Sequence, residues 1–337
     1  MNFAINGRTQ LAGVIGWPVE HSLSPAMHNA ALDALGLNWR YVAMPVRPGE
    51  VIAAVRGLAA LGFRGCNVTV PHKPAVIPAL NSISPEAETL GAVNTLIFTR
   101  DDTDTVRIAG HNTDVAGFIG DLRANGFEPE GRRVVVVGAG GAARGVVYGL
   151  LKAGAARVTV LNRTVERALA LIEDLMQRRK DAKTQGAGGQ ESRIKNQESA
   201  NHGFFTALPL TDETLVEFAR AADLLVNTTT VGMWPKVEGC VWPEGTPVPA
   251  ASTVYDLVYN PLETRLLRLA RQSGACAIDG LGMLARQGAL ALDLWTEQAL
   301  DVEAVTTLMR REAVNGQPSV DGRLYCAGPA VRDGDVG

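Results

Sequence analysis

The run RVVVVGAGGAARG, residues 133–145, constrains the fold of this chain more than any other segment. Four consecutive valines are typical of a parallel strand buried on both faces, and a turn with Gly138, Gly140 and Gly141 follows at once. Such a strand, turn and helix bring a pyrophosphate to backbone N–H groups at the positive end of the helix. The glycines alone leave a tight turn without a ligand open. The expected contacts in the turn are Gly138, Ala139, Gly140, Gly141 and Ala142.

The end of the next expected strand bears on which dinucleotide this turn accepts. NAD sites carry Asp or Glu about 20 residues beyond the glycines, where the carboxylate accepts hydrogen bonds from the ribose. This chain has Asn162, Arg163 and Thr164 there. A guanidinium pairs with a 2′-phosphate through charge-assisted hydrogen bonds of about 1.5–3 kcal/mol. The sequence therefore predicts NADP(H) as the cofactor, with a solvated loop arginine as the alternative.

Apolar runs alternate with helix-like stretches in two parts of the chain. Residues 11–70 follow the order β-α-β-α-β, in which Ser24 and Pro25 predict a helix N-cap, and a second alternation starts at Arg133. A length of 337 residues, 46% of them hydrophobic, allows two separate cores. The expected fold class is α/β, with two α/β domains of which the second is Rossmann-like.

Bulk properties exclude several classes of protein. A net charge of −3 gives no field that would attract nucleic acid or an anionic membrane surface. Four separated cysteines and five histidines show no metal-ligand or disulfide spacing, and no apolar run reaches the roughly 18 residues of a membrane span. We expect a cytoplasmic protein, a monomer or homodimer, that has no metal and acts on a small molecule.

Two segments have compositions unlike the rest. Residues 177–203 are rich in Gln, Glu, Lys, Ser and Gly, so that apolar burial there cannot offset an ordering cost of about 1–2 kcal/mol per residue. We expect a disordered insertion. Residues 314–337, rich in Gly and Asp, predict a loose tail.

Polar clusters punctuate the first part of the chain where strands end. In GCNVTVPHK, Asn67 and Thr69 share one face of an extended segment and Lys73 follows it, as a proton donor for carbonyl reduction or as a solvated surface lysine. In GHNTDVAGF, Asp114 precedes an apolar helix, as a partner of that lysine or merely as an N-cap. Two further clusters, with Ser22 and Ser24 before a helix and Asn94 beside a strand, offer ligands for an anion and for hydroxyl groups.

These segments, in this order, resemble the signature segments of the shikimate dehydrogenases. The resemblance covers about residues 11–297, apart from 177–203. It is carried by GVIGWPVEHSLSPAMHN, GCNVTVPHK, GAVNTL, GHNTDVAGF, VGAGGAARG, LNRT, YDLVYNPLET and GLGMLARQGA.

The resemblance implies a function and a domain plan. Residues 1–114 and 281–313 are implied as a substrate-binding domain, and residues 115–280 as a Rossmann-like NADP-binding domain. The implied activity is the reversible NADPH-dependent reduction of 3-dehydroshikimate to shikimate in aromatic amino acid (chorismate) biosynthesis. The rivals are a quinate/shikimate dehydrogenase with relaxed cofactor choice and a non-catalytic regulator that binds nucleotide and a ring acid.

The resemblance also assigns roles to individual residues. Lys73 and Asp114 are implied as the catalytic pair, and Gly280 and Met283 as neighbours of the nicotinamide. Thr228, where the family often has Ala, belongs to the cofactor side. The implied substrate ligands are Ser22, Ser24, Asn67, Thr69, Asn94, Tyr259 and Gln287.

Overall fold

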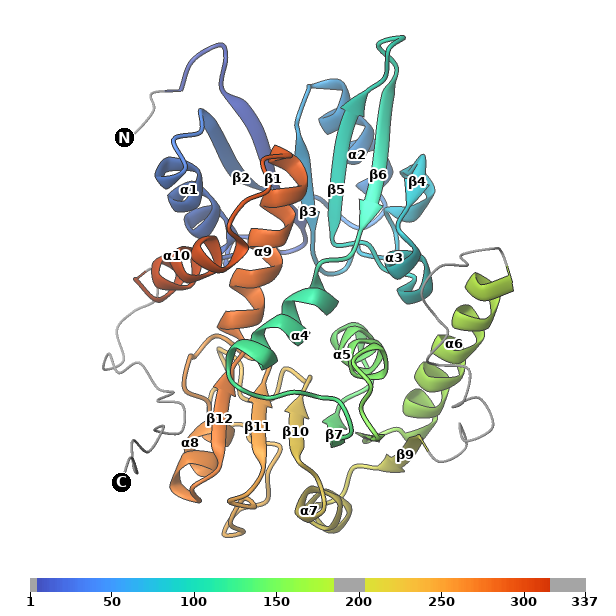
Figure 1. The fold of residues 1–337 in the computed structure, drawn as a ribbon, viewed down its shortest axis with the longest axis vertical. Helices are drawn as coiled ribbons and strands as arrows, with labels where there is room; N and C mark the ends of the chain where they lie inside the picture. Colours follow the sequence, from blue (N-terminus) through green and yellow to red (C-terminus); the bar gives the residue numbers. More distant parts are fainter. Residues whose placement is uncertain (1–4, 185–203, 316–337) are drawn as a thin grey trace, which may run out of the picture.

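The computed structural model describes residues 5–184 and 204–315. It consists of two lobes, each built on its own six-stranded sheet (Figure 1). The first lobe contains strands β1 to β6, and the second contains β7 to β12. The expected α/β class with two domains is confirmed.

The first sheet is mixed, with the strand order β2-β1-β3-β5-β6-β4. The predicted β-α-β-α-β order is present as β1, α1, β2, α2 and β3, and these three strands are parallel. The sequence analysis missed the antiparallel hairpin of β5 and β6. The elements are β1 (Gln10–Gly16), α1 (Ser24–Ala34), β2 (Trp39–Pro45), α2 (Val51–Ala60), β3 (Gly65–Val68), the 3-10 helix η1 (Ile77–Ala79), β4 (Ser82–Ile83), α3 (Pro85–Leu90), β5 (Thr95–Arg100) and β6 (Val106–His111).

Helices cover both faces of this sheet. Alternate residues of β1 point to opposite sides, so Val14 packs with α1, α9 and α10, whereas Ile15 packs with α2. Helices α9 (Leu281–Thr296) and α10 (Val302–Asn315) come from the end of the described chain, and Figure 1 shows them lying beside α1. The chain therefore returns to the first lobe, as the resemblance implied.

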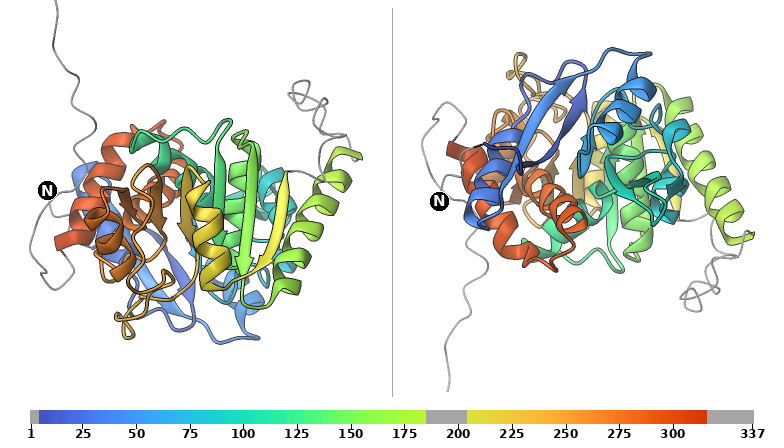
Figure 2. Two further views of the ribbon diagram at one scale, coloured as in Figure 1. Left: turned by 90° about the horizontal axis from the view of Figure 1, so that it is seen from below. Right: turned by 90° about the horizontal axis from the view of Figure 1, so that it is seen from above.

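The second sheet is entirely parallel, in the order β12-β11-β10-β7-β8-β9. Within β7, Val134 and Val136 face the core under α4 (Asp114–Ala124), α5 and α6, while Val135 and Val137 face the core under α7 and α8. Figure 2 shows helices on both faces of this sheet. The four valines are thus buried on both faces. The elements are β7 (Arg133–Val137), α5 (Gly141–Lys152), β8 (Arg157–Asn162), α6 (Val165–Thr184), β9 (Phe205–Pro209), α7 (Asp212–Arg220), β10 (Leu224–Asn227), β11 (Thr253–Asp256), α8 (Arg265–Gln272) and β12 (Cys276–Asp279).

Two helices connect the lobes and cross each other closely. Helix α4 (Asp114–Ala124) leads into the second lobe and α9 leads back, and glycines on both helices permit the approach. A Cβ on Gly117 would lie 2.9 Å from Cβ of Gln287, and one on Gly282 would lie 2.0 Å from Oδ1 of Asp121. The close crossing thus requires glycine at both positions, because any side chain there would collide with the other helix.

Three expectations about local structure need correction. Ser24 is the first residue of α1 and not its N-cap, which is Leu23. Residues 177–184 belong to α6 and are not disordered, because pairs such as Gln177 with Asp181 extend the helix through its polar end. Helix α10 continues to Asn315, two residues into the predicted tail. The remainder of both segments, 185–203 and 316–337, lies outside the described residues.

Within the described ranges, no helix has the length and apolar character that crossing a membrane requires. The same residues contain no group of three or more His, Cys, Asp or Glu side chains arranged to hold a metal ion.

Candidate active site

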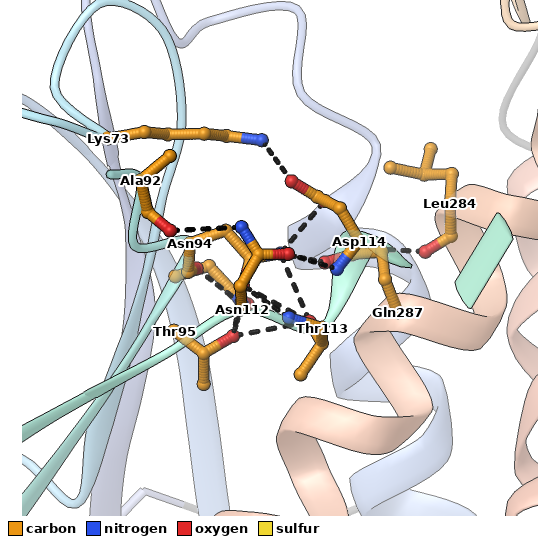
Figure 3. Close-up of polar contacts among 10 residues, drawn as sticks. Lys73, Ala92, Asn94, Thr95, Asn112, Thr113, Asp114, Leu284 and Gln287 are labelled. Carbon is orange, nitrogen blue, oxygen red and sulfur yellow. Dashed lines mark hydrogen bonds and ion pairs between the residues drawn. The ribbon is translucent and has the colours of Figure 1, made fainter. Parts of the chain in front are cut away.

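Lys73 and Asp114 form an ion pair between the turn after β3 and the first residue of α4 (Figure 3). Lys73 Nζ lies 2.6 Å from Asp114 Oδ2, and the two side chains are 28% and 20% exposed. The N-cap of α4 is Thr113, so the alternative that Asp114 merely caps the helix is wrong. The ion pair is thus largely shielded from solvent but still accessible to a ligand.

The carboxylate of Asp114 is held from a second direction as well. Asn94 Nδ2 donates to Asp114 Oδ1 over 2.8 Å, while Asn94 Oδ1 accepts from the backbone N–H of Thr113 over 2.8 Å. Asn112 Oδ1 accepts from the Asp114 N–H, and its Nδ2 donates to the Ala92 carbonyl, both over 3.0 Å. Each carboxylate oxygen therefore has its own donor, and the helix start that carries Asp114 is tied to the loop before β5.

Helix α9 brings a further expected residue to this network. Gln287 Oε1 accepts from Asn94 Nδ2 over 3.3 Å, and Gln287 Nε2 donates to the Leu284 carbonyl over 2.9 Å. Tyr259, in the segment after β11, packs against the first-lobe core, and burial raises the pKa of its phenol. Helix α9 thus contributes Gln287 to the network around Asp114, and Tyr259 of the second lobe contacts the first-lobe core.

Ser22 and Ser24 lie at the start of α1. The hydroxyl of Ser22 accepts from the Ser24 N–H over 3.3 Å, so Ser22 takes the hydrogen-bonding part that the sequence analysis gave to Ser24. Thr69 follows β3 and is half-buried, and a Cβ on Gly16 would lie 2.4 Å from its methyl group. The absence of a side chain at Gly16, the last residue of β1, therefore leaves room for Thr69.

The glycine turn after β7 divides into a tight part and an open part. Gly138 has a φ of +111°, and a Cβ on it would lie 2.5 Å from Thr228 Oγ1, which donates to the Val137 carbonyl. A Cβ on Gly140 or Gly141 would meet nothing within 4 Å. The N-terminus of α5 is thus accessible to an anion, with Ala139 and Ala142 beside these glycines in the turn.

Two exposed arginine side chains follow β8. Arg163 is exposed, and its guanidinium has no hydrogen bond or ion pair with any residue that the structure describes. Asn162 Nδ2 donates to the Thr164 carbonyl over 2.8 Å, which tightens this turn. Arg167, in the first turn of α6, is likewise exposed and was missed, although its spacing of four residues from Arg163 is visible in the sequence.

Gly280 and Met283 lie where the chain leaves β12 and enters α9. A Cβ on Gly280 would lie 2.2 Å from the Leu257 carbonyl oxygen, so packing alone requires a glycine there. Met283 is partly buried against the second-lobe core. Both residues therefore lie on the second-lobe side of the junction between the sheets.

Two buried hydroxyl groups near the site were missed by sequence reasoning. Thr95 Oγ1 donates to Asn94 Oδ1 over 2.9 Å, and Tyr41 Oη donates to Asn67 Oδ1 over 2.7 Å. Thr95 directly follows Asn94, and this adjacency was the available signal. Nothing near Tyr41 in the sequence indicates its contact, because its partner lies 26 residues away.

Three family profiles match the chain in order. The profile of the shikimate dehydrogenase substrate binding domain matches residues 14–96. That of shikimate / quinate 5-dehydrogenase matches residues 122–185, and that of the shikimate 5'-dehydrogenase C-terminal domain matches residues 280–310. The matches thus fall on both lobes and on the returning helices.

Known proteins resemble the chain over nearly its whole length. The shikimate dehydrogenase (NADP(+)) of Moorella thermoacetica is 43% identical, over 94% of this chain and 98% of the relative. The shikimate 5-dehydrogenase of Thermus thermophilus, solved with NADP(H) and shikimate, is 37% identical with a TM-score of 0.72, covering 90% of this chain and 99% of that one. A quinate dehydrogenase from Corynebacterium glutamicum, solved with NAD, is 30% identical with a TM-score of 0.73, covering 89% and 98%. Identity of 43% over more than nine tenths of both chains, with a similar fold in a solved relative, shows that this chain belongs to the shikimate dehydrogenase family.

Proposed function

We propose that this protein catalyses the reversible NADPH-dependent reduction of 3-dehydroshikimate to shikimate, a step of aromatic amino acid biosynthesis. The observation that carries the proposal is the contact of 2.6 Å between Lys73, after β3, and Asp114, at the start of α4. A sequence relative that is named as an NADP(+)-dependent shikimate dehydrogenase supports the same reaction, and so does a related structure that contains NADP(H) and shikimate.

The residues of the second lobe fit NADP(H). The open backbone at Gly140 and Gly141 suits a pyrophosphate at the N-terminus of α5. The exposed guanidiniums of Arg163 and Arg167 suit the 2′-phosphate, and no carboxylate stands in place of Arg163 to repel it. When bound, the cofactor supplies hydride chemistry. Thr228, Gly280 and Met283 complete the cofactor side of the proposal, with Asn162 and Thr164 shaping the adenosine end.

Lys73 is assigned the proton transfer. Its ammonium gives a proton to the ketone oxygen as that oxygen becomes an alcohol, and its charge stabilises the developing alkoxide beforehand. Asp114 fixes the ammonium in position through the ion pair, and Asn94 fixes Asp114 in turn. In the oxidation of shikimate, the same lysine receives the hydroxyl proton.

The first lobe is assigned the ring acid. Hydroxyl groups at the start of α1 suit the carboxylate, because both donate and lie at the positive end of a helix. Amide and hydroxyl groups around the ion pair suit the ring hydroxyls. The proposed ligands are Ser22 and Ser24 for the carboxylate, and Asn67, Thr69, Asn94, Tyr259 and Gln287 for the remaining contacts.

Several finer statements belong to the same proposal. We place the domain boundaries at residues 1–114 with 281–313, and at 115–280. We also place the protein in the cytoplasm, as a monomer or homodimer without nucleic acid partners. Cys66 and Cys240 are free thiols, the form that a reducing compartment maintains.

Initial rates with purified protein test the proposal. Shikimate and quinate are each offered with NADP and with NAD, and formation of reduced cofactor is followed at 340 nm. The expected result is the highest kcat/KM for shikimate with NADP. Comparable rates on quinate would favour the alternative of a quinate/shikimate dehydrogenase with relaxed cofactor choice. A protein that binds both ligands without turnover would instead be a regulator.

A further inference from the structure

A chain of hydrogen bonds runs through the interior of the first lobe and ends at Asp114. Its members come from β2, β3, the loop before β5, β5 and α4, and all of them except Asp114 are buried. Tyr41 Oη donates to Asn67 Oδ1 (2.7 Å), Asn67 Nδ2 to Thr95 Oγ1 (3.3 Å), Thr95 Oγ1 to Asn94 Oδ1 (2.9 Å), and Asn94 Nδ2 to Asp114 Oδ1 (2.8 Å).

One backbone N–H fixes the direction of the part nearest Asp114. The Thr113 N–H can only donate, and it lies 2.8 Å from Asn94 Oδ1, so the Asn94 carbonyl must face it. The Asn94 amide hydrogens then face the carboxylate, which can only accept when ionised. The reverse orientation would bring the two N–H groups together and two oxygens together. Figure 3 draws the contacts of Asn94 with Thr113 and Asp114.

The orientation of Asn94 then fixes the donors and acceptors in the rest of the hydrogen-bond series. Because Asn94 Oδ1 only accepts, Thr95 must supply the hydrogen of their 2.9 Å contact, and its oxygen is left to accept from Asn67. The Asn67 amide also donates to the Asn94 carbonyl, so Asn67 Oδ1 must accept from the Tyr41 phenol. Every donor in the series therefore points towards Asp114.

We propose that Thr95 is a positioning residue for the reaction assigned above, on which this inference rests. Its hydroxyl orients and polarises the Asn94 amide, and that amide holds the Asp114 carboxylate against Lys73. Hydrogen bonds aligned in one direction strengthen one another, so the Tyr41 phenol contributes from the far end with a smaller effect.

The test compares Thr95→Val, which keeps the shape and removes the donor, with Thr95→Ser, which keeps the donor. Thr95→Val should lower kcat for shikimate oxidation about tenfold, roughly the effect of one lost hydrogen bond, while KM for NADP stays unchanged. Thr95→Ser should restore most of kcat. The matched control is Thr159→Val, at a buried threonine of β8 in the second sheet, which should keep wild-type kcat whatever stability it loses.

A second variant examines the distant end. Tyr41→Phe keeps the ring that stacks on His28 at 4.0 Å between centroids and removes only the hydroxyl, and kcat should fall about threefold. Wild-type kcat in both Thr95→Val and Tyr41→Phe, or equal losses in Thr95→Ser and Thr95→Val, would overturn the inference. Lack of shikimate oxidation by the wild-type protein would instead refute the proposed function.

Discussion

The first-lobe side of the candidate site is made of side chains, whereas the second-lobe side is made largely of backbone. Around Asp114, amides and hydroxyls are buried and hydrogen-bonded to one another. At the turn after β7, Gly140 and Gly141 leave open space, and Arg163, after β8, is exposed to solvent. The first side is therefore organised before any ligand arrives, and the second presents general anion-binding groups. Substitutions on the first side should change the chemistry, and substitutions on the second should change cofactor affinity.

The largest effect is expected on the first side, from Lys73→Ala. Loss of the proton donor should lower kcat about a thousandfold, while KM for shikimate changes only a few-fold, because the hydroxyl-binding groups remain. Steady-state kinetics in both directions measure the two parameters.

The control for this experiment is Lys152→Ala. Lys152 forms an exposed ion pair with Glu86 and should be dispensable for turnover. Equal losses in kcat and in shikimate affinity for Lys73→Ala would contradict the assignment of Lys73 as proton donor.

An intermediate effect is expected on the second side, from Arg163→Gln. Loss of the guanidinium should raise KM for NADP about thirtyfold, equivalent to about 2 kcal/mol, with little change in kcat or in KM for NAD. The comparison between the two cofactors isolates the 2′-phosphate. Arg157→Gln, at the exposed start of the same strand, is the matched control and should change neither value. A parallel rise for NAD would assign Arg163 to another part of the cofactor.

The smallest effect is expected from His28, which packs in the first lobe behind the candidate site. His28 is buried against Tyr41, and burial lowers its pKa to about 4. In the unfolded chain His28 binds a proton near pH 6.5, whereas in the folded chain it does so only near pH 4. The stabilising contribution of neutral His28 is therefore complete above pH 6.5 and declines as the pH falls towards 4. Between pH 7.5 and pH 5.5 the free energy of unfolding should fall by about 1 kcal/mol for this reason.

Urea unfolding at both pH values, on the wild type and on His28→Phe, measures this contribution. The variant should lose less stability between pH 7.5 and pH 5.5 than the wild type does, because it has no group to protonate there. Identical pH dependence of the two proteins would show that His28 does not supply the effect.

Sequence patterns predicted well what depends on local order. The four valines indicated β7, and the glycines and Arg163 indicated the cofactor side, because a strand, a turn and a helix lie next to one another in the chain. The approach of Lys73 to Asp114, 41 residues apart, was expected from polar clusters at strand ends and is present at 2.6 Å. The roles assigned to these residues stay predictions.

Tertiary contacts explain what the sequence did not reveal. The hairpin of β5 and β6 pairs with β3 in the antiparallel sense, which no periodicity indicates. The polar end of α6 looked disordered by composition, yet Arg178 pairs with Asp174 one turn earlier and lies against Gly91 of the first lobe. The hydrogen bonds of Thr95 and Tyr41 could not be predicted, because both residues bond to Asn67 on a different strand.

The crossing of α4 and α9 has a mechanical consequence. These helices carry the chain between the lobes, and Asp114 and Gln287 lie on them close to the crossing that Gly117 permits. In any rotation of one lobe against the other about this crossing, atoms travel in proportion to their distance from the axis. Asp114 and Gln287, which lie close to the axis, would therefore keep their relative positions in such a rotation.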